Sequence, residues 1–353
     1  MIAVGLSGGA DSAAAALLLH DSGEELCGIT GYFGESNPGP EKLEKARYIC
    51  RYLGVDHHVV DVRKAFASIK NYFCSEYLAG NTPNPCVICN RDIKFDLLLK
   101  MVKGFGADRV ATGHYVRRGV ERGRYFVARA REANSQEYFL GLVSQDALRQ
   151  SMFPLESTTK DDAHGIVEAS GLSVPRNETS QDVCFLDSGQ YVPFVLSRTG
   201  HSIKPGPIMN SSGRVIGRHR GALNYTIGQR KGLGTGFGRR VYVLGINMAL
   251  NTVTVGDLDE WPHKGFIVRS VNYMKIPGID APMEALVKVR YRQQGERALI
   301  EPGQGGELLV HYRGLFSPGQ LAVVYDHEDA ILCAGIITTA LSYENSLPGG
   351  DAL

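Results

Sequence analysis

The first twenty residues constrain the fold of this chain most strongly. An apolar run, Ile2 to Leu6, leads directly into Ser-Gly-Gly-Ala-Asp-Ser and then into a segment rich in alanine and leucine. The apolar run predicts a buried strand and the alanine-rich segment predicts a helix. Glycines let the backbone turn sharply, and free amides at a helix N-terminus favour an anion. We therefore expect a phosphate-binding loop, although Asp11 or Ser12 is also typical of a plain helix N-cap.

Short apolar runs alternate with helical patterns over the first part of the chain, which predicts an α/β fold with a parallel sheet covered on both faces. We expect this domain to be doubly wound and Rossmann-like, with a hairpin between Tyr115 and Arg129. The expected strands are Ile2 to Leu6, Leu26 to Phe33, His57 to Val62 and Arg109 to Thr112. The expected helices are Asp11 to His20, Glu41 to Leu53, Lys64 to Leu78, Arg91 to Val102, Ser135 to Gln150 and Lys160 to Ser170.

Beyond about Asp187 the sequence changes to glycine, proline and short apolar runs, which favour β-structure. PGPIMNSSGRVIG predicts one hairpin, and RRVYVLGIN followed by NTVTVGD predicts another. After Trp261, five or six short runs recur about every ten residues, which is typical of a small β-barrel. We therefore expect three domains: residues 1–200, a small, mostly-β central domain at 201–260, and a C-terminal β-barrel at 261–353.

Charge is distributed unevenly, although the formal net charge is only +1. The segment from Ser188 to Gly256 contains no Asp or Glu, whereas nine Lys and Arg residues fall within it. A segregated basic segment favours a polyanionic partner over a merely solvated basic surface.

The sequence predicts no membrane partner, because it contains no apolar run of about eighteen residues. It begins directly with a strand-like run, which predicts no signal peptide. Seven scattered cysteines favour reduced thiols over a disulfide framework. Together these features predict a cytoplasmic protein.

Two of the cysteines, Cys86 and Cys89, form a Cys-x-x-Cys motif within NTPNPCVICNRDIK. Such a motif is typical of half a zinc site or of a redox pair. A structural zinc site normally has four ligands, and no second motif completes one here. Cys89 also precedes the helix expected from Arg91, and a helix N-terminus lowers the pKa of a thiol.

Several segments together resemble a known family. SGGADS resembles the pyrophosphate loop of the ATP pyrophosphatases, which split ATP into AMP and pyrophosphate. The segments that follow resemble, in order, landmarks of the tRNA-specific 2-thiouridylases: TPNPCVICNRDIKF, ATGHY, SQDVCFL, YTIGQRKGLG, VRYRQ and SPGQLAV. The resemblance spans nearly the whole chain. It implies a sulfurtransferase that uses ATP to turn the 2-oxygen of the tRNA wobble uridine into a leaving group, and then replaces it with sulfur.

The resemblance also implies an ATP site with Mg²⁺. Gly31 and Gly113 are expected to lie against the nucleotide, and Asp11 to contact the metal. Gly113 follows an expected strand, and ligands gather at the carboxyl ends of the strands in an open α/β sheet. The loop residues expected to bind ATP are Gly5, Leu6, Ser7, Gly8, Gly9, Ala10, Asp11 and Ser12.

For the sulfur chemistry, the resemblance implies that Cys184 carries a persulfide received from a sulfur-donor protein. Cys89 would then attack this persulfide and leave a disulfide between Cys89 and Cys184 for reduction. Taken by itself, Cys184 in Val-Cys-Phe-Leu is equally typical of a buried apolar cysteine.

Cys86 departs from the family pattern. Many members have an aspartate at this position, which is expected to act as acid or base. The unperturbed pKa of a thiol, about 8.5, lies far from that of an aspartate. Two roles therefore stay open for Cys86: a substitute that handles a proton, or a ligand that joins Cys89 and Cys184 in an iron–sulfur cluster.

The resemblance implies tRNA contacts in several parts of the chain. Asn84, Pro85 and Cys86 are expected to line the pocket for the target base, which must leave its stack before reaction. His114 and Tyr115 resemble a pair that lies near this base. The other expected tRNA contacts are Asn134, Ser135, Gln136, Arg230, Lys231, Arg290, Tyr291 and Gln320.

Two other functions agree with parts of the pattern. One is another ATP pyrophosphatase, such as a carbon–nitrogen ligase that adenylates a small carboxylate. Such an enzyme needs neither cysteines at the transfer site nor a long basic segment. The other is a non-catalytic RNA-binding protein with an unused nucleotide loop, against which the intact Asp11 and Ser12 argue.

Overall fold

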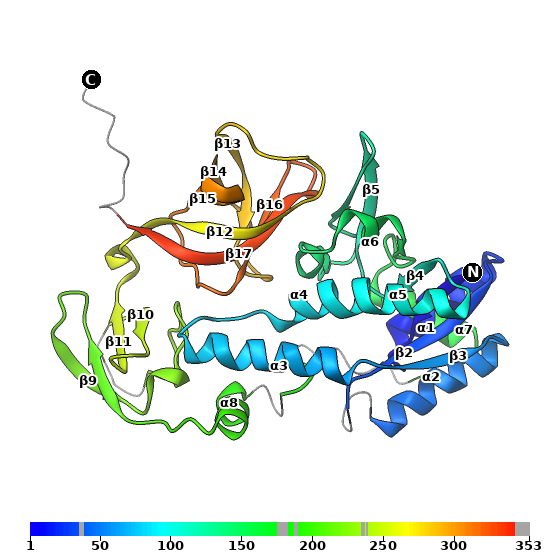
Figure 1. Cartoon of the computed structure of the whole chain (residues 1–353), viewed down its shortest axis with the longest axis horizontal. Helices are drawn as coiled ribbons and strands as arrows, with labels where there is room; N and C mark the ends of the chain where they lie inside the picture. The colour runs from blue at the N-terminus through cyan, green and yellow to red at the C-terminus, as the bar shows by residue number, and fades with distance from the viewer. Residues whose placement is uncertain (35–38, 175–182, 187–189, 234–236, 238, 343–353) are drawn as a thin grey trace.

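The computed structural model describes residues 1–34, 39–174, 183–186, 190–233, 237 and 239–342. Its strands form a five-stranded sheet, a four-stranded sheet, a two-stranded hairpin and a closed six-stranded barrel. In Figure 1 the five-stranded sheet and the four-stranded sheet lie toward opposite ends of the long axis, with the barrel beside them. The expected fold class, a Rossmann-like domain followed by a small β-domain and a barrel, is confirmed.

The N-terminal sheet has the order β3-β2-β1-β4-β7, and all its neighbouring strands are parallel. The short edge strand β7 was not predicted, because two residues carry no recognisable alternation. The strands are β1 (Ile2–Gly5), β2 (Leu26–Tyr32), β3 (His57–Asp61), β4 (Arg109–Thr112) and β7 (Ser151–Met152).

Helices cover both faces of this sheet because successive strand residues point to opposite sides. Ile2 and Val4 share one buried core with α1 (Ala10–Asp21), α2 (Pro40–Leu53) and α7 (Lys160–Ala169). Ala3 and Cys27 belong to a second core, which α3 (Arg63–Leu78), α4 (Pro85–Cys89) and α5 (Leu98–Val102) complete. Successive residues of β1 thus pack against different sets of helices, which gives the doubly wound arrangement.

The helix expected from Arg91 begins six residues earlier, at Pro85. Proline suits the first position of a helix, where no backbone N–H is needed. The side chain of Asn84 caps this end by accepting a 3.4 Å hydrogen bond from the amide of Val87. After α4 the helix continues as a π-helical segment, Asn90–Leu97, before α5. Cys89 therefore lies inside a continuous helix, and the prediction that it precedes the helix N-terminus is wrong.

The single helix expected from Ser135 to Gln150 is interrupted in the structure. A 3₁₀ turn, Glu137–Leu140, is followed by a separate α6 (Gln145–Arg149). Between them, the carbonyls of Gly141 and Val143 each accept a 2.9 Å hydrogen bond from the side chain of Asn272 in the barrel. Packing against the barrel thus replaces the helical hydrogen bonds at this point.

The rest of the chain forms a hairpin, a small domain and a barrel. The predicted hairpin consists of β5 (Arg117–Glu121) and β6 (Arg124–Ala128). Both predicted hairpins of the central domain are present as β8 (Gly206–Met209), β9 (Val215–His219), β10 (Tyr242–Asn247) and β11 (Thr252–Gly256). The unpredicted helix α8 (Tyr191–Thr199) precedes them. Single 3₁₀ turns lie at Lys103–Phe105, Ala222–Asn224, Leu258–Glu260 and Gln304–Gly306.

The barrel packs its side chains into the core of the N-terminal domain. Leu321, Val323, Tyr325 and Ala334 belong to the same buried core as Val87, Ile93 and Phe95 around the Cys-x-x-Cys helix. No helix in the described part of the chain is long and apolar enough to cross a bilayer. The barrel strands are β12 (His263–Tyr273), β13 (Met283–Lys288), β14 (Glu296–Pro302), β15 (Leu308–His311), β16 (Leu321–Tyr325) and β17 (Ile331–Ser342).

Candidate active site

The loop from Gly5 to Ser12 joins β1 to α1 and is held by its own hydrogen bonds. The hydroxyl of Ser12 accepts a 3.2 Å hydrogen bond from the amide of Ser7 and donates one of 2.9 Å to the carbonyl of Gly9. Gly8 has φ +78°, and a Cβ there would collide with the carbonyl of Lys42. Leu6 and Ala10 are buried, whereas Ser7 is exposed. The loop is therefore preformed, with the N-terminus of α1 open to an anion.

The predicted nucleotide residues gather at one edge of the sheet. Gly113 directly follows β4, and a Cβ there would lie 2.8 Å from the carbonyl of Asp11. Gly31 lies near the end of β2, the strand beside β1. The sequence thus brings Asp11, Gly31 and Gly113 to the carboxyl ends of three adjacent strands, where open α/β sheets bind ligands.

Tyr115 is placed differently from the prediction. Its buried phenol donates a 2.6 Å hydrogen bond to Oδ1 of Asp11, so it supports the nucleotide loop instead of facing a flipped base. The other oxygen of Asp11, a half-buried residue, has no hydrogen-bond partner among the described residues. One free carboxylate oxygen beside a phosphate loop fits Mg²⁺, which usually takes one or two carboxylates together with substrate phosphates.

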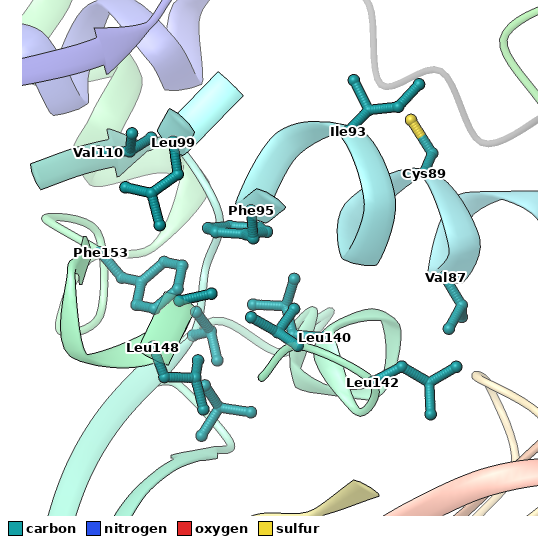
Figure 2. Close-up of a cluster of buried hydrophobic side chains, with 14 of the residues drawn as sticks. Val87, Cys89, Ile93, Phe95, Leu99, Val110, Leu140, Leu142, Leu148 and Phe153 are labelled. Atoms are coloured by element: carbon teal, nitrogen blue, oxygen red, sulfur yellow. The ribbon is translucent and has the colours of Figure 1, made fainter. Parts of the chain in front are cut away.

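The three predicted cysteines come together from two separate segments. Cys86 and Cys89 lie on α4, which packs against α3. Cys184 is brought to α3 by its neighbour Phe185, whose ring meets those of Phe66 at 5.6 Å and Phe73 at 5.2 Å. Figure 2 shows the sulfur of Cys89 beside Ile93, on the side of the helix away from Leu140 and Leu142.

These thiols lie within electrostatic range of one another. Burial, with smaller contributions from negative charge on Cys184, Cys86 and Asp92, raises the pKa of Cys89 to about 12 against the opposing charge of Lys94. Burial also raises the pKa of Cys86, with a smaller contribution from Cys184 in the same direction. Cys184 itself is exposed. The exposed thiol of Cys184 thus lies beside the half-buried thiol of Cys86 and the buried thiol of Cys89, both of which are neutral at pH 7.

The cysteines do not form a metal site in this arrangement. Among the described residues, no group of three or more His, Cys, Asp or Glu side chains converges to hold a metal ion. No disulfide forms between cysteines in the described part of the chain. This geometry fits neither a zinc site at the Cys-x-x-Cys motif nor an iron–sulfur cluster held by Cys86, Cys89 and Cys184.

His114 connects the nucleotide loop with the thiols. It follows Gly113, and its ring lies 5.8 Å from that of Phe95 in the π-helical segment. Its Nδ1 is 2.8 Å from Oγ1 of Thr112. Removal from water and the charge of Lys94 hold the pKa of His114 well below its ordinary value. The imidazole is therefore neutral at pH 7, and it joins the two halves of the site.

The barrel holds the loop that carries Asn84, Pro85 and Cys86. The amide of Thr82 donates a 2.8 Å hydrogen bond to the carbonyl of Pro318, and Nε2 of Gln320 donates one of 2.8 Å to the carbonyl of Thr82. Gly319, with φ +87°, lies directly against this loop. Gln320, predicted to contact tRNA, therefore also positions the pocket loop.

The other predicted barrel contacts lie at domain junctions. The hydroxyl of Tyr291 donates a 2.8 Å hydrogen bond to the carbonyl of Asn134, so two predicted tRNA contacts meet. Arg290 donates a 2.9 Å hydrogen bond to the carbonyl of Ile227 in the central domain. Both residues follow β13 in a turn, not in an extended strand.

In the segment from Asn134 to Gln136, one residue is exposed and the other two support Tyr115. Asn134 is exposed, but Ser135 is buried, and its hydroxyl donates a 3.2 Å hydrogen bond to the carbonyl of Tyr115. The side-chain oxygen of Gln136 accepts a 3.0 Å hydrogen bond from the amide of Tyr115. Ser135 and Gln136 thus hold Tyr115, and of the three only Asn134 presents its side chain fully to solvent.

Basic side chains surround a cavity of about 380 Å³ in the central domain. Arg230 and Lys231 are exposed, and neither side chain has a hydrogen-bond or ion-pair partner among the described residues. The sequence analysis did not single out Arg239 and Arg240 as site residues, although their place in the acid-free segment was a signal. The cavity is lined by Arg230, Gly232, Leu233, Phe237, Arg239, Arg240 and Val241.

Three family models match successive parts of the chain. The first, described as tRNA methyl transferase HUP domain, matches residues 1–188. The second, tRNA methyl transferase PRC-barrel domain, matches residues 194–257. The third, Aminomethyltransferase beta-barrel domain, matches residues 263–337.

Similar proteins span nearly the whole chain. The tRNA-specific 2-thiouridylase MnmA of Moorella thermoacetica is 37% identical over 95% of this chain and 98% of its own length. The protein of that name from Desulfitobacterium hafniense is 35% identical, covering 96% and 98%. Among solved structures, U34-tRNA thiolase NcsA from Methanococcus maripaludis with its 4Fe-4S cluster has a TM-score of 0.36 and 19% identity, covering 56% of this chain and 63% of its own. A structural likeness this low carries no argument about the cofactor.

Proposed function

This chain belongs to the tRNA-specific 2-thiouridylases and is a tRNA sulfurtransferase that uses ATP, and we propose that it acts on the wobble uridine in two steps. In the first, the 2-oxygen of the uridine attacks the α-phosphorus of ATP and pyrophosphate leaves. In the second, sulfur from a Cys184 persulfide, released with the help of Cys89, displaces AMP and gives 2-thiouridine.

One observation carries this proposal. The dipeptide Gly113-His114 touches both halves of the site, because Gly113 packs on Asp11 of the nucleotide loop and His114 lies 5.8 Å from Phe95 on the helix of Cys86 and Cys89. A base between them would therefore have a phosphate loop on one side and thiols on the other. Adenylation and sulfur transfer can then occur without release of the activated tRNA.

The first step draws on the preformed loop. Gly8, Gly9 and the N-terminus of α1 supply backbone amides for the phosphates of ATP. Asp11, oriented by Tyr115, would hold Mg²⁺ together with the phosphates, and the metal would supply positive charge beside the leaving pyrophosphate. We expect the nucleotide to lie beside Gly31 and Gly113; the absence of a side chain at Gly113 also lets this segment pack closely on Asp11.

The second step balances as a thiol–persulfide exchange. Cys89 first gives its proton to water. Its thiolate then attacks the Cys184 sulfur that is bonded to the Cys184 side chain, the S–S bond of the persulfide breaks, and hydrosulfide leaves. Hydrosulfide then adds to C2 of the adenylated uridine and AMP departs. The disulfide between Cys89 and Cys184 is reduced by two electrons from an external thiol, and a persulfide-bearing donor protein reloads Cys184.

We assign Cys86 a role as proton donor. Its pKa is raised by burial, so the side chain carries its proton at pH 7 and is poorly suited to act as a base. It follows Asn84 and Pro85 in the loop proposed to receive the flipped uridine. We do not propose a cluster, because no three potential ligands converge among the described residues. Iron and sulfide analysis after anaerobic purification tests this choice.

The proposed function is tested by thiolation in vitro with tRNA, ATP, Mg²⁺ and a persulfide or sulfide source. Nucleoside analysis should show 2-thiouridine at the wobble position, formed together with AMP and pyrophosphate. Sulfur incorporated at another position, or without hydrolysis of ATP, would overturn the proposal.

A further inference from the structure

Two half-buried lysines lie beside the thiols, and neither has an acidic partner among the described residues. Lys94 belongs to the π-helical segment that directly follows Cys89. It makes no hydrogen bond or ion pair with any described residue. Its charge acts on groups from two elements, Cys86 and Cys89 on its own helix and His114 after β4. π-Helical segments are rare and frequently occur at functional sites.

The second lysine, Lys70 of α3, lies beside Cys184. Its ammonium lies 4.8 Å from the ring centroid of Phe66 and 5.9 Å from that of Phe185, the residue after Cys184. Such cation–π contacts hold an ammonium in place without neutralising it. Lys70 has no hydrogen bond or ion pair among the described residues.

The carboxylates on the same helices are engaged elsewhere. Asp92 forms hydrogen bonds of 2.5 and 3.0 Å with Arg91. Asp96 forms an ion pair with Lys100, and Glu76 accepts a hydrogen bond from Asn81. Arg198, whose charge also acts on Lys70, is bonded to Asn71. Lys70 and Lys94 therefore keep their positive charge available to the sulfur atoms.

We propose that Lys94 and Lys70 are positioning residues for the sulfur-transfer step, Lys94 holding the thiolate of Cys89 and Lys70 holding the charged sulfur on Cys184. The inference rests on the proposed function. In that step one negative charge moves from Cys89 to the departing hydrosulfide, so a cation at each end matches the charge before and after transfer. No proton or electron beyond those already named is required.

The test measures alkylation by iodoacetamide at pH 7 in the full-length enzyme, without tRNA or ATP, resolved by mass spectrometry of the peptides. A thiolate reacts and a thiol does not, so loss of a nearby cation slows its own cysteine. Lys94→Met should slow Cys89 about threefold to tenfold and leave Cys184 nearly unchanged. Lys70→Met should show the reverse pattern, and arginine at either position should restore the rate.

The controls lie on the same helices. Lys64→Met on α3 and Lys100→Met on α5 remove exposed lysines and should change neither rate. Lys70→Gln supplies a second variant if Lys70→Met lowers the melting temperature. Unchanged rates at both cysteines, or the same decrease at both in each variant, would overturn the assignment. Alkylation needs no tRNA. If the thiolation assay fails but each lysine variant still slows only its own cysteine, the proposed reaction is overturned and the assignment of the two lysines is kept.

Discussion

The phenol of Tyr115 donates a 2.6 Å hydrogen bond to Oδ1 of Asp11, across 104 positions of sequence. Tyr115 is buried, and its backbone is held by Gln136 and Ser135. The carboxylate of Asp11 is therefore oriented by a rigid group. This bond ties the phosphate loop to the segment that leads toward the barrel.

Removal of this bond should weaken the use of ATP. In Tyr115→Phe the carboxylate keeps its charge but loses its orientation, so we expect KM for ATP to rise about tenfold to a hundredfold, the value of one hydrogen bond to a charged group, about 1.5–3 kcal/mol. Release of pyrophosphate in the presence of tRNA measures the effect. Tyr138→Phe, which loses a buried 2.8 Å bond to the carbonyl of Leu321, is the control. It should lower the melting temperature and leave KM for ATP unchanged.

Loss of the carrier thiol should separate the two steps. Cys184→Ser should abolish 2-thiouridine formation while adenylation of tRNA, followed as pyrophosphate release, continues. Cys27→Ala removes a buried cysteine from the opposite part of the sheet and should retain thiolation. Thiolation by the Cys184→Ser enzyme would contradict the carrier role.

The pKa of Cys89 predicts how its reactivity depends on pH. With a pKa of about 12, the alkylation rate of Cys89 should rise about tenfold per pH unit between pH 7 and 10. An unperturbed thiol would level off near pH 8.5. Since the folded pKa lies above the unfolded one, Cys89 also contributes stability below pH 8.5 that is lost as pH rises toward 12. A plateau near pH 8.5 in the folded enzyme would contradict this.

The contact of the barrel with the pocket loop should be sensitive to one added methyl group. In Gly319→Ala the new Cβ lies 3.1 Å from the backbone of Thr82, and φ is +87°. We expect a loss of about 1–3 kcal/mol in the free energy of unfolding and slower thiolation. Gly305→Ala is a matched control, because φ is +64° but no atom lies within 4 Å. It should lower stability and leave the rate of thiolation unchanged.

The arginines of the central cavity should contribute to tRNA affinity through charge. Arg230→Ala should weaken tRNA binding and reduce the slope of log K against log salt by about 0.7 to 1, as expected for one phosphate contact. Binding titrations at several salt concentrations measure this slope. Arg51→Ala, on the exposed face of α2, should leave the slope unchanged.

Much of the fold could be predicted because it depends on local patterns. The apolar run from Ile2 to Leu6, and the buried spacing of Ala46, Ile49, Cys50 and Leu53 in α2, produce the elements that they predict. Elements that depend on distant contacts were missed. The region after Leu140 leaves the helical pattern because Asn272 takes its carbonyls, and α8 forms where its aromatic side chains pack on Phe73 and Tyr77 of α3.

The site was less predictable than the fold. Motifs identified the loop, the thiols and Gly113, which the fold brings to adjoining positions. The helix start at Pro85 was misplaced because its Asn-Pro signal was assigned to a turn. The roles of Tyr115 and Ser135 depend on contacts between segments far apart in sequence, which residue type alone does not reveal.

The shared core between the barrel and the Cys-x-x-Cys helix has a consequence for synthesis of the protein. Leu321, Val323, Tyr325 and Ala334 are synthesised long after Val87 and Phe95, yet they complete the apolar surroundings of these two residues. A nascent chain that ends before β16 leaves this core open. Thiol chemistry therefore has to wait until β16 and β17 have been synthesised, so a chain terminated before β16 would lack an organised sulfur-transfer centre even with every catalytic residue present.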